Sequence, residues 1–124
     1  MIDFQNAKFV KLGEVDNDTY AKLVGPILIA GEEIVATYKA IRDGVVFTNK
    51  RIIAINVQGF TGAKKDITSL PYSKIQSYSV ETAGVLDLDS ELDLVFSGLG
   101  TVRFEFVRRA SVTDICKLIS ERVL

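Results

Sequence analysis

Residues 42–62 read RDGVVFTNKRIIAINVQGFTG, in which two apolar, β-branched runs flank a short polar break. Runs of this composition around a turn predict a β-hairpin. The break holds two adjacent cations, Lys50 and Arg51, which either bind a phosphate group or simply belong to the turn. We favour a turn, because Asn49 tolerates left-handed backbone angles and Thr48 can form local hydrogen bonds. The stem of Arg51 would then pack on the sheet; a salt bridge, a subunit contact and a phosphate-binding pair remain the alternatives.

A second hairpin is predicted closer to the end of the chain. Segments 91–96 and 102–106 each alternate apolar and polar residues, and a glycine-containing stretch separates them. Two alternating segments around such a loop are typical of a hairpin. Both apolar sets must face one core, so we expect an odd-numbered loop with a bulge. The expected partner of Phe96 is Val102 or Phe104.

Helical signals lie at the two ends of the chain. Ser111 followed by Asp114 resembles a capping box, and apolar residues then recur at helical spacing, so 111–124 is predicted to be an amphipathic helix. In 1–31, an Asp-Asn-Asp triplet followed by a Gly-Pro stop predicts an N-terminal extension with short helical turns. Residues 32–107 have the composition of consecutive strands. A bent, partly closed antiparallel sheet with the helix covering its open end would bury all of these apolar faces.

The composition excludes several classes of function. The 124 residues suit a single domain, and the net charge of -1 makes bulk attraction to nucleic acid or to an anionic membrane unexpected. There is no histidine, which excludes Cys–His zinc sites and Ser–His catalysis within the chain. We expect no cofactor, no metal and no enzymatic activity.

The same composition indicates a compartment. The single cysteine, Cys116, permits no internal disulfide and fits a reducing environment. On the predicted helix it is expected to be a small buried apolar residue. The N-terminus has no signal-peptide pattern, and no apolar run has the length of a membrane helix. We therefore expect a cytoplasmic protein.

Six short motifs follow one another along the middle and the end of the chain. They are Arg42-Asp43-Gly44, Phe47-Thr48-Asn49-Lys50-Arg51-Ile52-Ile53, Gly59-Phe60-Thr61-Gly62, Ser69-Leu70-Pro71-Tyr72, Ser79-Val80-Glu81-Thr82-Ala83-Gly84 and Asp87-Leu88-Asp89-Ser90-Glu91-Leu92. In this order and spacing they resemble the bacterial pleckstrin-homology domain family. The resemblance runs from about Glu32 to the end of the chain.

The resemblance implies a pleckstrin-homology superfold, mostly β, in which two nearly orthogonal antiparallel sheets with seven strands in total are capped by one C-terminal helix. It also implies ring-like homo-oligomers in the cytoplasm of a bacterium. It leaves the biochemical role open, because a fold does not by itself give a function.

A set of basic residues forms the candidate patch for an anion or a phospholipid head group: Lys39, Arg42, Lys50, Arg51, Lys64 and Lys65. Lipid-binding pleckstrin-homology domains hold phosphate with Lys and Arg spread over the first strand, its loop and the second strand. Here the matching loop is short and carries Asp43 beside Arg42. We therefore favour ordinary solvated surface, unless the fold brings Lys50 and the Lys64-Lys65 loop together.

A set of acidic residues and one aromatic forms the candidate oligomer interface: Glu81, Asp87, Asp89, Glu91 and Phe60. The acids match a calcium loop poorly because its central glycine is absent. We favour a solvated edge that discourages strand pairing, with self-assembly as the alternative. An exposed Phe60 would anchor a partner, but we favour a Phe60 that pins its own loop to the core.

The two charged sets together lead to a functional expectation. If they lie on different sides of the barrel, complementary faces give head-to-tail contacts, which close into rings when the rotation permits. We expect a non-enzymatic module that forms ring-like homo-oligomers and binds protein or peptide. Its first expected partner is another copy of the same chain, and we expect no binding to nucleic acid. The alternative is binding of an anion or a phospholipid head group through the basic loops, with membrane lipid the less favoured partner.

Overall fold

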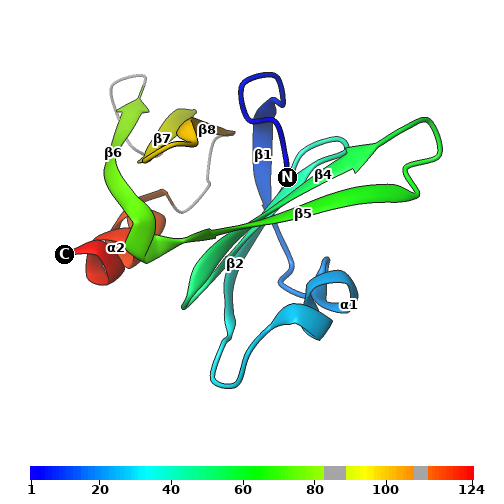
Figure 1. The fold of residues 1–124 in the computed structure, drawn as a ribbon, viewed down its shortest axis with the longest axis horizontal. Helices are drawn as coiled ribbons and strands as arrows, with labels where there is room; N and C mark the ends of the chain where they lie inside the picture. Colours follow the sequence, from blue (N-terminus) through cyan, green and yellow to red (C-terminus); the bar gives the residue numbers. More distant parts are fainter. Residues whose placement is uncertain (83–88, 108–111) are drawn as a thin grey trace.

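The structure is a computed structural model that describes residues 1–82, 89–107 and 112–124 (Figure 1). The elements in chain order are β1 (Phe9–Val15), α1 (Ala21–Val24), the 3-10 turn η1 (Gly25–Ile27), β2 (Ile34–Lys39), β3 (Gly44–Thr48), β4 (Arg51–Gln58), β5 (Lys64–Pro71), the 3-10 turn η2 (Tyr72–Lys74), β6 (Ile75–Thr82), β7 (Ser90–Phe96), β8 (Gly100–Phe106) and α2 (Val112–Val123). The short helix α1 confirms the predicted helical segment near the N-terminus. The predicted residues Asp87 and Ser111 lie outside the described part.

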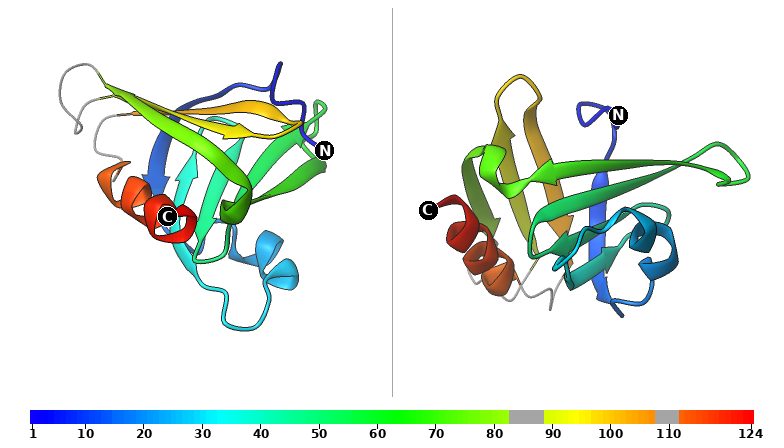
Figure 2. Two further views of the ribbon diagram at one scale, coloured as in Figure 1. Left: turned by 60° about the vertical axis from the view of Figure 1, so that its left-hand side comes forward. Right: turned by 60° about the horizontal axis from the view of Figure 1, so that its bottom comes forward.

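The strands form one curled sheet in the order β5-β4-β3-β2-β1-β8-β7-β6. Strands β2 to β5 make one half and β6 to β8 the other, and β1 joins them, antiparallel to β2 and parallel to β8. The sheet curls into a half-barrel, and α2 lies at its open side (Figure 2). The mostly β architecture with a C-terminal helix is as predicted.

The predicted count of seven strands is wrong, because the described residues form eight. The additional strand, β1, lies inside the segment expected to hold only helical turns. Its two buried residues, Phe9 and Leu12, are three positions apart instead of two. Between them Lys11 has a φ of 57° and the register with β8 shifts. The parallel β1–β8 pairing also corrects the expectation of purely antiparallel strands.

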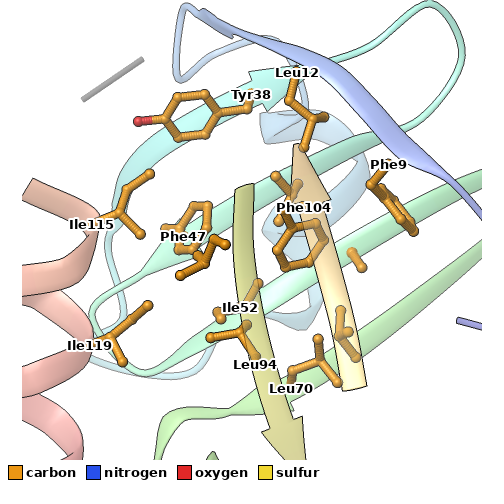
Figure 3. Packing of buried hydrophobic residues seen from close by; sticks show 14 of the residues in the cluster. Phe9, Leu12, Tyr38, Phe47, Ile52, Leu70, Leu94, Phe104, Ile115 and Ile119 are labelled. Carbon is orange, nitrogen blue, oxygen red and sulfur yellow. The ribbon is translucent and has the colours of Figure 1, made fainter. Parts of the chain in front are cut away.

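The interior of the half-barrel is filled by side chains (Figure 3). Alternate residues of β7 and β8 face inward, and Leu92, Leu94 and Phe104 have no exposed surface. Ile115 and Ile119 enter from α2 and close the open side, as the apolar spacing of the helix predicts. Each such side chain contributes about 1.5–3 kcal/mol when it is removed from water.

A second, smaller core lies on the other face of β3 and β4. There Val24, at the end of α1, packs with Val46, Ile53 and Ile55. As a result β3 is buried on both faces, which explains why its sequence is continuously apolar instead of alternating. The N-terminal helical segment therefore covers the outer face of the sheet.

The hairpin of β7 and β8 has the predicted odd-numbered loop, residues 97–99, but the predicted bulge is absent from its continuous register. Leu94 lies opposite Val102, while Phe96 lies opposite Gly100. The prediction that Phe96 pairs with Val102 or Phe104 is therefore wrong by one pair. The loop is shorter than expected because Gly98 and Gly100, with φ of 81° and 93°, turn the chain tightly. The parity is still right, since both apolar sets face the core.

Candidate functional site

Arg51, one of the two adjacent cations at the turn between β3 and β4, is held by hydrogen bonds to other residues of the same chain. Its Nε and Nη2 donate to the two carboxylate oxygens of Glu32, at 2.9 and 3.0 Å. The guanidinium also donates to Ser69 Oγ at 3.0 Å and to the carbonyl of Ile27 at 2.6 Å. This is the salt bridge that the sequence left open as an alternative. Four contacts leave this guanidinium little capacity for a phosphate.

The turn itself forms with the predicted local hydrogen bonds of Thr48, but Asn49 does not adopt the left-handed backbone angles that the prediction allowed for. Thr48 Oγ1 accepts hydrogen bonds from the backbone N–H groups of Lys50 and Arg51, each at 3.0 Å. Burial raises the pKa of Glu32, but the hydrogen bonds from Arg51 and Thr48 outweigh it and hold that pKa below its ordinary value. A carboxylate that is charged and buried in this way is a structural group tying the α1–β2 segment to the hairpin.

The six basic candidates fall into two separate places. The β3–β4 turn carries Lys50 and Arg51, whereas the β2–β3 and β4–β5 loops lie at the other end of those strands. The fold does not bring Lys50 together with the Lys64-Lys65 pair. We call the second place the basic tip; it consists of Lys39, Ile41, Arg42, Phe60, Lys64 and Lys65.

The basic tip presents two apolar side chains to solvent. The solvent-accessible surface of Ile41 is 92% of that of a fully accessible reference residue, and that of Phe60 is 109%. The favoured interpretation that Phe60 pins its loop to the core is therefore wrong. Arg42 Nη2 donates to the carbonyl of Gly59 and so ties the two loops together, and Asp43 accepts from the backbone N–H of Val57 at 2.8 Å.

Carboxylates are stacked across the outer face of β6, β7 and β8. Glu81 lies opposite Glu91, and Glu91 lies opposite Glu105. In the next row Asp93 and Arg103 form a bidentate ion pair at 2.8 and 3.0 Å, and Arg103 reaches Glu91 at 3.5 Å. Like charges directly opposite one another in a sheet are destabilising. We call Glu81, Asp89, Glu91, Asp93 and Glu105 the acidic face.

A pocket of about 380 Å³ opens beside the acidic face. Its lining combines Phe106 and Val107 with Glu81, Glu91, Glu105 and the bulged Lys11. Ser90 also lines it; this side chain is 3% exposed, and its Oγ makes no hydrogen bond to any described residue. The pocket is therefore a partly apolar hollow with an acidic rim and a buried hydroxyl.

The basic tip and the acidic face lie at opposite ends of the molecule. The β4–β5 loop is at one end of the longest axis, and β6 to β8 lie toward the other end (Figure 1). Among residues 1–82, 89–107 and 112–124, no group of three or more His, Cys, Asp or Glu side chains is placed to hold a metal ion.

Sequence reasoning missed several residues of these surfaces, among them Ile41, Ser90 and Glu105. Glu105 was missed because the predicted register of the hairpin, wrong by one pair, did not place it opposite Glu91 as the structure does. Ile41 stands next to Arg42 in the same loop and carries no distinguishing pattern. Ser90 draws attention only through its buried, unbonded hydroxyl, which no sequence pattern shows.

The chain matches the family model described as bacterial PH domain over residues 3–123. It belongs to the bacterial PH domain family. The Uncharacterized protein YjqA of Bacillus subtilis is 46% identical over 96 residues, which cover 76% of this chain and 77% of YjqA.

Two solved structures are similar to this bacterial PH domain. A protein with a pleckstrin-homology domain from Shewanella loihica has a TM-score of 0.80 and 40% identity, with 93% of this chain and 99% of that chain covered. A pleckstrin homology domain from Shewanella amazonensis has a TM-score of 0.66 and 42% identity, with 96% and 93% covered. None of the helices in the described part of the chain is long and apolar enough to span a bilayer.

Proposed function

We propose that this bacterial PH domain is a non-enzymatic, protein-binding module that assembles with copies of itself, head to tail, into a closed ring. The observation that carries the proposal is the placement of the basic tip and the acidic face at opposite ends of one molecule. A chain with a net charge of -1 gains no bulk attraction, so any electrostatic attraction comes from these local surfaces.

Surfaces that are complementary but located at different places produce heterologous contacts. In such a contact the tip of one copy meets the face of the next, so an open chain of copies keeps one unused tip at one end and one unused face at the other until it closes. A constant rotation between neighbours gives a ring when it closes and a filament when it does not. The ring implied by the family resemblance is the closed case.

The non-enzymatic part of the proposal is supported by two features. The sequence has no histidine, the side chain most often used as a general acid or base at neutral pH. The inside of the half-barrel is filled by buried apolar side chains from the strands and α2.

A peptide is the second kind of protein partner that this fold can accept. β6 is an edge strand of the sheet and pairs with β7 along one side. Tyr78 of β6 is tied to α2 through hydrogen bonds to the Cys116 carbonyl, at 3.3 Å, and to Ser120 Oγ. An extended peptide can add to such an edge through backbone hydrogen bonds.

The test of self-assembly uses charge reversal on the acidic face. Glu81→Lys combined with Asp89→Lys changes two exposed positions, and the matched control is Glu33→Lys combined with Glu121→Lys, which makes the same charge change at exposed positions elsewhere. Sedimentation velocity should show that the wild type and the control assemble while the acidic-face variant is monomeric. Retained assembly of that variant would refute the electrostatic basis of the proposal.

Binding of an anionic head group is a second candidate function, and one observation favours it. Ile41 and Phe60 stand fully exposed among the cations of the basic tip. Apolar side chains beside Lys and Arg are also what an anionic membrane surface attracts. In this candidate the contributing cations are Lys39, Arg42, Lys64 and Lys65, while Lys50 lies at the opposite end of the hairpin.

A further inference from the structure

Phe60 stands on a loop that is held in a defined shape. It lies between Gly59 and Gly62, whose φ angles of 76° and 69° belong to the region that favours glycine. Gly59 receives the hydrogen bond from Arg42, and the Gly62 carbonyl receives one from Lys65 Nζ at 2.9 Å. A loop ordered in advance loses little conformational entropy when it binds. Phe60 is therefore an exposed aromatic on an ordered support.

The pocket beside the acidic face has the opposite character. Phe106 and Val107 provide an apolar part, and Glu81, Glu91 and Glu105 provide a negative rim. Its volume of about 380 Å³ lies within the range of sites that enclose small molecules or single side chains. The ring of a phenylalanine fits such a hollow in size and in polarity.

Ser90 is a second feature of this pocket, independent of its charge, that favours a bound partner. Its hydroxyl is buried at the pocket wall and makes no hydrogen bond within the described residues. A buried polar group without a partner carries a free-energy penalty. If the Ser90 side chain rotates toward the pocket when a loop is inserted, the backbone N–H and C=O groups of that loop can bond its hydroxyl in either direction.

We infer that Phe60 of one copy of this chain inserts into the pocket between β1 and the acidic ends of β6 to β8 of the next copy. The contact rests on the proposed head-to-tail assembly and specifies its centre. The cations around Phe60, among them Arg42, Lys64 and Lys65, then meet the carboxylates that rim the pocket. The buried aromatic supplies affinity, and the surrounding charges supply orientation and a fast encounter.

The geometry of the single chain makes a crosslinking test unambiguous. The β4–β5 loop, which carries Phe60, and the end of β6, which carries Glu81, lie toward opposite ends of one molecule, so a short link between the two residues can form only between two copies. Phe60→Cys and Glu81→Cys, each in a Cys116→Ser background, are mixed and treated with a short bis-maleimide. The matched control replaces Glu81→Cys by Glu33→Cys, which lies elsewhere on the surface.

We expect the Phe60→Cys and Glu81→Cys mixture to give a crosslinked dimer in at least about tenfold higher yield than the control mixture. Equal yields, with a wild-type chain that assembles normally, overturn the inferred contact and leave the proposed self-assembly intact. A wild-type chain that stays monomeric overturns both.

A mixing experiment tests the direction of the contact without new cysteines. Phe60→Ser lacks the inserted aromatic but keeps the pocket, whereas Glu81→Lys combined with Asp89→Lys keeps Phe60 but has a reversed rim. Each variant alone should be monomeric, and the mixture should form one-to-one dimers with an affinity at least about tenfold above either self-association. Failure of the mixture to associate, while the wild type assembles, overturns the inference.

Discussion

Arg51 and Glu32 form a bidentate ion pair, with Nε 2.9 Å from Oε2 and Nη2 3.0 Å from Oε1. The Glu32 side chain has no exposed surface, and the Arg51 side chain is 20% exposed. The pair joins the segment that precedes β2 to the start of β4. The most prominent cation of the sequence therefore stabilises the fold, and its neighbour Lys50 remains in solvent.

Arg51→Ala should lower the free energy of unfolding by about 3 kcal/mol, because it leaves the buried Glu32 carboxylate without its counter-charge. Lys50→Ala is the matched control, since it removes an adjacent cation that is exposed, and it should change stability by less than about 0.5 kcal/mol. Urea denaturation measures both. Equal effects of the two substitutions would show that the ion pair contributes nothing to stability.

Glu32 should also give the fold a specific dependence on pH. Its pKa is lower in the folded chain than the ordinary 4.5, so the unfolded state binds a proton more readily. The stabilisation is fully present above pH 4.5 and is lost as the pH falls through the folded pKa. Glu32→Gln should therefore lose less stability than the wild type between neutral pH and about pH 3 in denaturation experiments. Parallel curves for the two proteins would contradict this assignment.

Gly44→Ala should destabilise the second core. A Cβ at Gly44 would lie 2.3 Å from Tyr20 Oη, so the tyrosine that covers this face must move, at a cost of about 1–3 kcal/mol. Gly13→Ala is the control, because its Cβ would meet Val107 at an ordinary 3.5 Å. In a Tyr20→Ala background the effect of Gly44→Ala should shrink, as a double-mutant cycle would show. An undiminished effect would place its cause elsewhere.

Vesicle sedimentation separates self-assembly from head-group binding. If the basic tip serves protein contacts, the wild type should not be retained by phosphatidylcholine vesicles that contain phosphatidylserine, at low or at high salt. The opposite result is retention that weakens with salt and is lost in Lys64→Glu combined with Lys65→Glu. With Lys50→Glu as the unaffected control, that pattern would favour the lipid candidate.

The β7–β8 hairpin shows what the sequence could predict well. Alternation of Leu92 and Leu94 with acids, and of Phe104 with its polar neighbours, identifies the buried face. The inward-facing set is buried as predicted. The predicted register was wrong by one pair. The backbone angles of the glycines set the length of the loop, and the pattern of polar and apolar side chains does not indicate those angles.

β1 was missed because its apolar residues do not follow the period of a strand. Phe9 and Leu12 both face the core only because the backbone bulges at Lys11, which has a positive φ. Such a bulge is stabilised by the parallel neighbour β8, nearly a hundred residues away in sequence. Local pattern therefore predicted no strand here.

The sequence predicted most residues of the basic tip and the acidic face, but it did not predict where these two surfaces lie on the molecule. The sequence identified Phe60, Lys64, Glu81 and Glu91 as interface or patch candidates. Their separation into two ends depends on how β4–β5 and β6–β8 extend in opposite directions in space (Figure 2). The exposure of Phe60 follows from a loop fixed by Arg42, a contact over 17 positions.

Native mass spectrometry of the wild-type chain at low and at high ionic strength tests the central claim most directly. We expect a discrete oligomer, a whole multiple of the 13.6 kDa chain, that dissociates when salt screens the opposed charges of the two ends. A monomer at both ionic strengths and at high protein concentration would contradict head-to-tail assembly and, with it, the role assigned here to Phe60.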